Sequence, residues 1–124
     1  MRRTTLAVAL VVAAVLGAGT VALGATTLRI QADKTNKLAF NTKVLTARAG
    51  KITIVMTNPS ILPHNVAIRA GTTATSKLIA KGKIVTKGGT STVTAVLKPG
   101  KYRFLCTVPG HEAGGMWGIL TVKK

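Results

Sequence analysis

Hydrophobic and polar residues alternate along most of the chain after residue 25, in short runs rich in Val, Ile and Thr. Alternation with a period of two is typical of strands that bury one face, and Gly, Pro, Asn and Lys separate these runs as turn signals. Residues 73–80 are expected to form a loop or a short helix. Short strands at this spacing favour an all-β sandwich. The predicted strands cover 27–31, 43–47, 51–57, 65–69, 83–86, 91–97, 101–106 and 117–122.

Residues 1–25 have a different pattern, which is typical of an export signal. Arg2 and Arg3 precede a long stretch rich in Ala, Val and Leu, and small residues follow that would suit cleavage after Gly24 or Ala25. If the segment is retained, the uncharged run 4–28 is long enough to anchor the chain in a bilayer. In both cases we expect the folded part, residues 26–124, to be exported to the periplasm, the extracellular space or the cell surface.

Side-chain parity within the predicted strands places three chemically distinctive residues at the ends of rows that face the core. Successive residues of a strand point to opposite faces of its sheet. Cys106 therefore continues the inward row of Phe104, while Arg103 is expected to point outward. His64 and Met116 also stand at the ends of apolar rows. The pattern thus brings a thiol, an imidazole and a thioether to the edge of the core.

The composition limits what the protein can do. The chain has 124 residues, 18 of them Lys or Arg and only two acidic, which gives a formal charge of +16. This length supports one small domain, and a hydrophobic content of 47% excludes disorder. An aromatic content of 3% argues against modules that stack the bases of single-stranded nucleic acid. The basic residues form no stripe, so we expect a solvated basic surface and no specific nucleic-acid binding.

The residues that can bind a metal are concentrated in two short segments. One is Cys106-Thr-Val-Pro-Gly-His111-Glu-Ala-Gly-Gly-Met116, a loop between two predicted strands, and the other contains His64. Taken singly, each of these residues has an ordinary structural explanation, but together they include the only Cys and both His of the chain. A thiolate and a thioether favour Cu(I), and imidazoles suit both oxidation states. The set therefore predicts a copper site, beside which Glu112 is expected to be a solvated loop residue.

The two segments resemble those of the cupredoxins, the small blue copper proteins, and the resemblance extends over about residues 40–122. It implies a Greek-key β-sandwich of seven to eight strands with one type 1 copper ion. It further implies that Asn65 ties the two ligand loops together and donates from its backbone to the cysteine sulfur. Pro63 stands where azurins carry a glycine, and the ligand loop is similar to those of auracyanin and rusticyanin. The implied ligands are His64, Cys106 and His111 in the equatorial plane and Met116 on the axis.

The resemblance also implies a function without catalysis, the shuttling of single electrons by cycling between Cu(II) and Cu(I). His111 would present its edge through an apolar patch that includes Leu62, Pro109 and Ala113. We expect a monomer that docks transiently on an acidic redox protein, such as a cytochrome, an oxidase or a reductase. The positive charge also allows contact with an anionic membrane surface. A copper-handling or copper-storage protein is the alternative, and a multicopper enzyme would need further histidines that the chain lacks.

Overall fold

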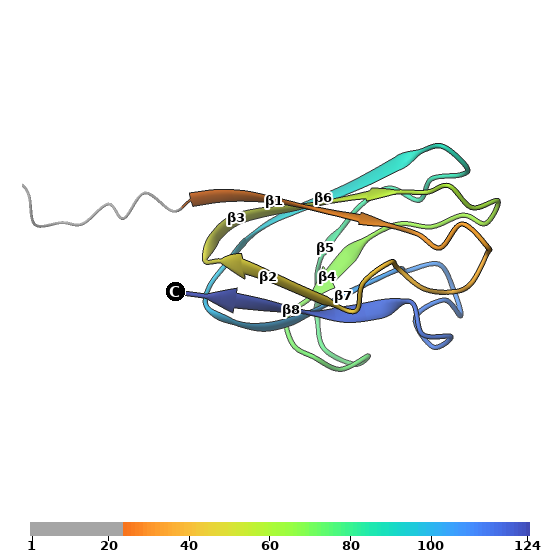
Figure 1. Cartoon of the computed structure of the whole chain (residues 1–124). Coiled ribbons are helices and arrows are strands. Elements are labelled where there is room, and N and C mark those ends of the chain that lie inside the picture. The colour runs from red at the N-terminus through yellow and green to blue at the C-terminus, as the bar shows by residue number, and fades with distance from the viewer. Residues whose placement is uncertain (1–23) are drawn as a thin grey trace, which may run out of the picture.

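The computed structural model describes residues 24–124, so residues 1–23 of the predicted signal or anchor at residues 1–25 lie outside the described residues, and its last two residues, Gly24 and Ala25, belong to a strand. Two packed β-sheets form this part of the chain (Figure 1), which confirms the all-β sandwich. No helix within it is long and apolar enough to cross a membrane. The strands are β1 (Gly24–Gln31), β2 (Val44–Arg48), β3 (Gly50–Thr57), β4 (Ala67–Arg69), β5 (Leu78–Lys81), β6 (Thr90–Leu97), β7 (Gly100–Leu105) and β8 (Trp117–Lys123).

The chain changes sheet at most of its connections. A three-stranded sheet has the order β1-β3-β6, and a five-stranded sheet has the order β2-β8-β7-β4-β5. Only β4–β5 and β7–β8 join neighbours within one sheet, while β1 pairs with β3 and β2 with β8 in parallel. These crossings close the sandwich, so that segments distant in the sequence meet at its two ends.

One predicted strand is wrong. Residues 83–86 form no strand and contribute only an isolated bridge between His64 and Val85. The strand in this region is β5, most of which falls in the segment 73–80 that is predicted to be a loop or a short helix. It lies at the edge of its sheet and pairs only with β4, where the register shifts between Ile68 and Arg69. Its residues are mostly exposed, and an edge strand of this kind lacks the buried, alternating face that gives a strand its sequence signal.

The core lies between the two sheets and follows the predicted parity. In β3 the side chains of Ile52, Ile54 and Met56 are fully buried and alternate with more exposed neighbours. Phe104 of β7 faces them from the other sheet and packs against Phe40, with 5.6 Å between ring centroids. The same cluster of buried residues contains Cys106 and Met116. Two of the predicted ligands therefore belong to the end of the hydrophobic core.

Gly118 of β8 offers a direct test of this packing. A Cβ atom at this position would meet Cζ of Phe104 and would lie 2.6 Å from the main-chain oxygen of Lys43. Neither neighbour can move easily, since Phe104 is fully buried and the Lys43 oxygen accepts a hydrogen bond from Ile119. Gly118→Ala is therefore expected to lower the free energy of unfolding by about 2 kcal/mol through overpacking.

Denaturant unfolding measures this loss. The matched control is Gly24→Ala, because a Cβ atom at Gly24 meets nothing within 4 Å. We expect the control to unfold at the same denaturant concentration as the parent. A Gly118→Ala variant that did the same would contradict the packing described here.

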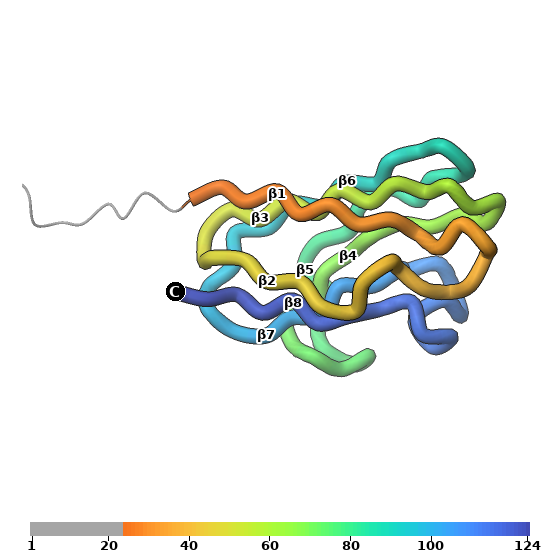
Figure 2. The backbone as a smooth tube through the Cα atoms, in the orientation of Figure 1, coloured from red at the N-terminus to blue at the C-terminus, as the bar shows by residue number. Residues whose placement is uncertain are grey.

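The two ends of the sandwich differ in what they carry. At one end β1 begins and β8 ends, and at the other lie the loops that follow β3 and β7 (Figure 2). His64 follows β3, and the loop from Cys106 to Met116 joins β7 to β8. All four predicted ligands therefore lie at this second end, which we call the metal end.

Candidate metal centre

Three donor atoms converge at the metal end. The Nδ1 atoms of His64 and His111 are 3.2 Å apart. Sγ of Cys106 lies 3.9 Å from the first and 3.6 Å from the second. Cys106 and His64 are fully buried, and His111 is half-buried. The fold thus places two imidazoles and a thiol around one point, although His64 is 42 residues away from Cys106 in the sequence.

The protonation of these groups suits a metal ion. Burial lowers the pKa of His64, with a smaller contribution from the charge of His111, and burial also lowers the pKa of His111. Both rings are therefore kept neutral, with lone pairs available to a metal. Nε2 of His64 is buried without a hydrogen-bond partner among residues 24–124, so Nδ1 is the atom of this ring that is directed at other donors. Two neutral imidazoles beside a thiol match the donor set that copper prefers.

The sulfur of Cys106 is buried but receives hydrogen bonds. Burial raises the pKa of the Cys106 thiol, while backbone N–H groups of Asn65 and Val108 donate to the sulfur and lower it in part. These donors would stabilise the thiolate that binds a metal. The contact from Asn65 agrees with the role that the cupredoxin resemblance implies.

Met116 closes the ligand loop. Its side chain is fully buried in the core cluster that includes Cys106. Its backbone oxygen accepts a hydrogen bond from the N–H of Cys106, and its own N–H donates to the oxygen of His111, both at 3.0 Å. The three predicted ligands of this loop are thus joined directly through the main chain.

Asn65 links the two segments that carry the ligands. Its side-chain oxygen accepts a hydrogen bond of 2.7 Å from the N–H of Thr107, and its amide nitrogen donates to the Thr107 hydroxyl at 2.8 Å and to the Gly82 oxygen at 3.0 Å. Asn65 is fully buried, so no solvent competes for these bonds. The residue next to His64 is therefore fastened to the residue next to Cys106.

Asn65→Ala is expected to lower the free energy of unfolding by about 2 kcal/mol, because it leaves buried partners without hydrogen bonds. It should also weaken copper binding, since the two ligand segments lose their side-chain link. Chemical denaturation and a competitive copper titration measure the two effects. The control is Asn41→Ala, which removes a solvent-exposed hydrogen bond to Gln31 and should leave copper binding unchanged. Equal behaviour of the two variants would contradict the linking role.

A buried polar residue that is not among the predicted site residues holds the turn before His64. Asn58 is fully buried, and its amide nitrogen donates to the oxygens of Leu62 at 2.8 Å and Val85 at 2.9 Å. Its side-chain oxygen accepts hydrogen bonds from the backbone and the hydroxyl of Ser60. The Asn58-Pro59 pair was recognisable as a turn signal, but its contact with residue 85 depends on the tertiary fold.

Glu112 is not a solvated loop residue, which corrects the prediction made from the sequence. Its Oε1 atom lies 2.7 Å from Nη2 of Arg69, and its Oε2 atom lies 2.9 Å from Nη1 of Arg103. Arg103, expected to point to the face opposite Phe104, is 8% exposed, stacks 3.7 Å from the centre of the Trp117 ring and donates to the Thr72 oxygen. The loops that contain Thr72 and Glu112 cover this outer face of the sheet.

Repulsion between two arginines explains why the Glu112 carboxylate lies between them. Arg69 and Arg103 are directly opposite each other on β4 and β7, where two like charges repel. Partial burial raises the pKa of Glu112, but the hydrogen bonds and charges of Arg69 and Arg103 outweigh it, so the net pKa lies below its usual value. The carboxylate therefore neutralises a repulsive pair and ties the metal loop to the sheet. The signal that could have revealed this cluster is the scarcity of acids, because only Asp33 and Glu112 are available to neutralise arginines that stand in predicted strands.

Exposed apolar side chains lie in the loops of the metal end, where His111 is half-buried. Ile61 is 68% exposed and Ile84 is 53% exposed. Ile84 was not predicted, and the bridge between His64 and Val85 brings it to this end. Of the predicted patch residues, Leu62 is half-buried, and Pro109 and Ala113 are exposed. Pro63, next to His64, is exposed as well.

Fold and donor set together define a cupredoxin. The chain matches the family of copper-binding proteins of the plastocyanin/azurin type over residues 26–123. It is 35% identical to plastocyanin of Ginkgo biloba over 91 residues, which cover 69% of this chain and 89% of that protein. The chain therefore belongs to the plastocyanin/azurin family, and the arrangement of His64, Cys106, His111 and Met116 is consistent with one type 1 copper ion as its cofactor.

Solved structures of auracyanins are similar as well. Reduced auracyanin from Roseiflexus castenholzii superposes with a TM-score of 0.69 at 33% identity, covering 82% of this chain and all of that one. Auracyanin A from Chloroflexus aurantiacus, described as a "blue" copper protein, gives a TM-score of 0.69 at 28% identity, covering 81% and 100% of the two chains. The similarity to auracyanins that the ligand loop implied is thus confirmed at the level of the whole domain.

Proposed function

We propose that this protein carries single electrons between redox partners by means of one copper ion held by His64, Cys106, His111 and Met116. The observation that supports this most directly is the convergence of two imidazole Nδ1 atoms and one thiol at the buried end of the core. When bound, copper supplies a Cu(II)/Cu(I) couple. The residues of the chain supply two further requirements of electron transfer, a site of fixed geometry and access for a partner.

The first requirement is a site whose geometry changes little. His64 and Cys106 are fully buried, Asn65 fastens their segments together, and Glu112 ties the loop from Cys106 to Met116 to β4 and β7. Donors held in this way keep their positions in both oxidation states. The site therefore favours rapid electron exchange.

The second requirement is access for a partner. His111 is half-buried at the metal end, whereas the other donors are enclosed. The loops of this end also carry apolar side chains, which are Ile61, Leu62, Ile84, Pro109 and Ala113. A small apolar patch suits a transient interface, and we assign the electron port to the edge of His111. No catalytic residue is assigned, because both histidines and the only cysteine of the chain belong to this site. This supports a carrier over an enzyme.

The proposed location is outside the cytoplasm, in the periplasm or at the cell surface. The support is the sequence pattern of residues 1–25, which suits an export signal or a retained anchor. The proposed carrier is a monomer that meets its partners by diffusion.

A copper titration of the purified full chain tests the proposal. We expect an intense visible absorption that saturates at one equivalent of Cu(II), is bleached by a reductant and returns on reoxidation. A storage protein would instead bind several copper ions without a reversible band of this kind. Absence of the band at saturating Cu(II) would overturn the proposal.

Electron exchange with an acidic partner protein is expected to slow about tenfold as ionic strength rises from about 0.01 to 0.5 M, because salt screens attraction between the proteins. Basic residues on segments next to the patch include Lys83, which neighbours Ile84, and Lys34 and Lys37, since Asn36 of their loop accepts a hydrogen bond from the N–H of Ile61. Stopped-flow kinetics measure the rate. A small neutral oxidant serves as the control, and a rate independent of salt would exclude electrostatic steering.

A further inference from the structure

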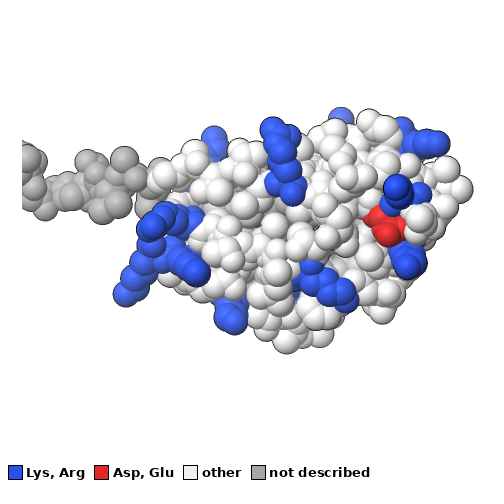
Figure 3. Space-filling view, in the orientation of Figure 1, with Lys and Arg blue, Asp and Glu red and all other residues white. Residues whose placement is uncertain are grey.

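The end of the sandwich opposite the metal end carries a cluster of positive charge, which we call the basic end. Figure 3 shows Lys and Arg side chains gathered where β8 ends. Both acids of the chain, Asp33 and Glu112, lie in loops at the metal end, so no acidic side chain balances this cluster. Its members are all exposed, and they are Arg48, Lys51, Lys98, Lys101, Lys123 and Lys124.

The strand register shows why these residues meet. Arg48 at the end of β2 pairs with Lys123 of β8, and its Nη1 atom donates to the main-chain oxygen of Lys124 at 3.2 Å. Lys51 pairs with Val96 near the start of β3. Lys98 and Lys101 flank the turn from β6 to β7. The cluster is therefore formed by strand ends of both sheets and is fixed by the fold.

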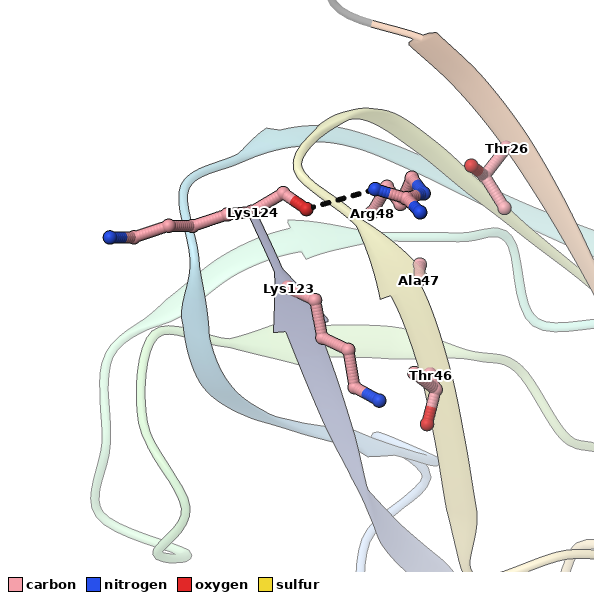
Figure 4. Close-up of a pocket in the computed structure, with 6 residues that line it drawn as sticks. All are labelled: Thr26, Thr46, Ala47, Arg48, Lys123 and Lys124. Atoms are coloured by element: carbon pink, nitrogen blue, oxygen red, sulfur yellow. Dashed lines mark hydrogen bonds between the residues drawn. The ribbon is translucent and has the colours of Figure 1, made fainter.

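A surface hollow lies within the basic end. Its volume is about 590 Å³, and Figure 4 shows the side chains that line it. Hydroxyl groups and cationic groups are both present at its walls, which suits an oxyanion such as a phosphate. The lining residues are Thr26, Thr46, Ala47, Arg48, Lys123 and Lys124.

The sequence before β1 indicates what faces this end. β1 begins at Gly24, which pairs with Gly50, so the chain enters the sandwich at the basic end. The uncharged run covers residues 4–28. Its last five residues, 24–28, belong to β1, so residues 4–23 precede the strand. These twenty residues carry no charge, and about 20 apolar residues suffice to span a bilayer. No polar linker separates them from the strand.

We propose that the basic end docks on the anionic phospholipid headgroups of a membrane and that the metal end faces away from it. The proposal rests on the proposed location outside the cytoplasm but not on copper. Lipid is favoured over a soluble polyanion because the apolar segment joins the domain at this same end. Eight-residue strands separate the two ends by about 25 Å. The His111 patch would thus remain free for a soluble partner.

The test uses the metal-free full chain reconstituted in vesicles of phosphatidylcholine, with or without phosphatidylglycerol. A water-soluble amine-acylating reagent is added, and mass spectrometry gives the reaction rate of each lysine. With phosphatidylglycerol we expect the lysines of the basic end to react at least about threefold more slowly, and 0.5 M salt should reverse this protection. The internal controls, whose rates should not change, are Lys34, Lys37, Lys83 and Lys87.

Two variants of equal charge make the test specific. One replaces Lys98, Lys101 and Lys123 with glutamine, and the other replaces Lys34, Lys37 and Lys83 with glutamine. Only the first should remove the protection of the remaining lysines at the basic end. Protection that is absent, that is equal at both ends or that does not depend on phosphatidylglycerol would overturn the proposal. A failure to bind copper would instead overturn the proposed function and leave this result unaffected.

Discussion

Cys106→Ser is expected to abolish the intense visible absorption of the copper-loaded protein. Serine is close to cysteine in size, so the buried position beside Phe104 should remain filled. The hydroxyl oxygen, however, lacks the soft, easily ionised sulfur on which a blue-copper site depends. The two imidazoles, with Nδ1 atoms 3.2 Å apart, remain in place. We therefore expect residual Cu(II) binding at reduced affinity, without the strong band.

Absorption and electron paramagnetic resonance spectra of the two proteins, each with one equivalent of Cu(II), measure the change. Met116→Leu and Met56→Leu form a matched pair of controls, since both methionines are fully buried but only Met116 belongs to the ligand loop. The Met116 variant should keep the band with altered intensity, and the Met56 variant should match the parent. A serine variant that retained the band of the parent would show that Cys106 is not a ligand.

The copper site could be predicted because it depends on rare residues. The chain has two His and one Cys, so their occurrence at fixed spacing in two segments carries more information than any run of common residues. Strand periodicity then placed Cys106 and His64 on inward faces, where the structure has them. These predictions needed only local sequence and the geometry of a strand.

Contacts between distant segments could not be predicted in the same way. The strand β5 was missed because it pairs at a sheet edge with little buried surface. Parity predicts that Arg103 points to the face of the sheet opposite Phe104, but it does not predict the loops that cover that face. The register of β4 against β7, which opposes Arg69 and Arg103, and the placement of Glu112 between them exist only in the folded chain.

Glu112→Gln is expected to lower the free energy of unfolding by about 3 kcal/mol, because removing one member of a largely buried charge cluster leaves the others uncompensated. The Glu112 side chain is 15% exposed, and that of Arg103 is 9% exposed, so water would screen the remaining repulsion only weakly. A solvent-exposed ion pair would contribute no more than about 1 kcal/mol to the free energy of unfolding. Glutamine keeps the size of the side chain, so the loss reports the charge.

Equilibrium denaturation of the metal-free protein gives this free energy, and a copper competition titration shows whether the ligand loop is loosened with it. Asp33→Asn is the matched control, since it removes the other acid of the chain, whose hydrogen bonds are exposed to solvent. It should leave both measurements close to those of the parent.

A double-mutant cycle combines Glu112→Gln with Arg69→Gln. The losses of unfolding free energy in the two single variants should not add, because both side chains belong to one ion-pair cluster. Additive losses would mean that Glu112 acts independently of Arg69, and the carboxylate would then not be what fastens the metal loop to β4.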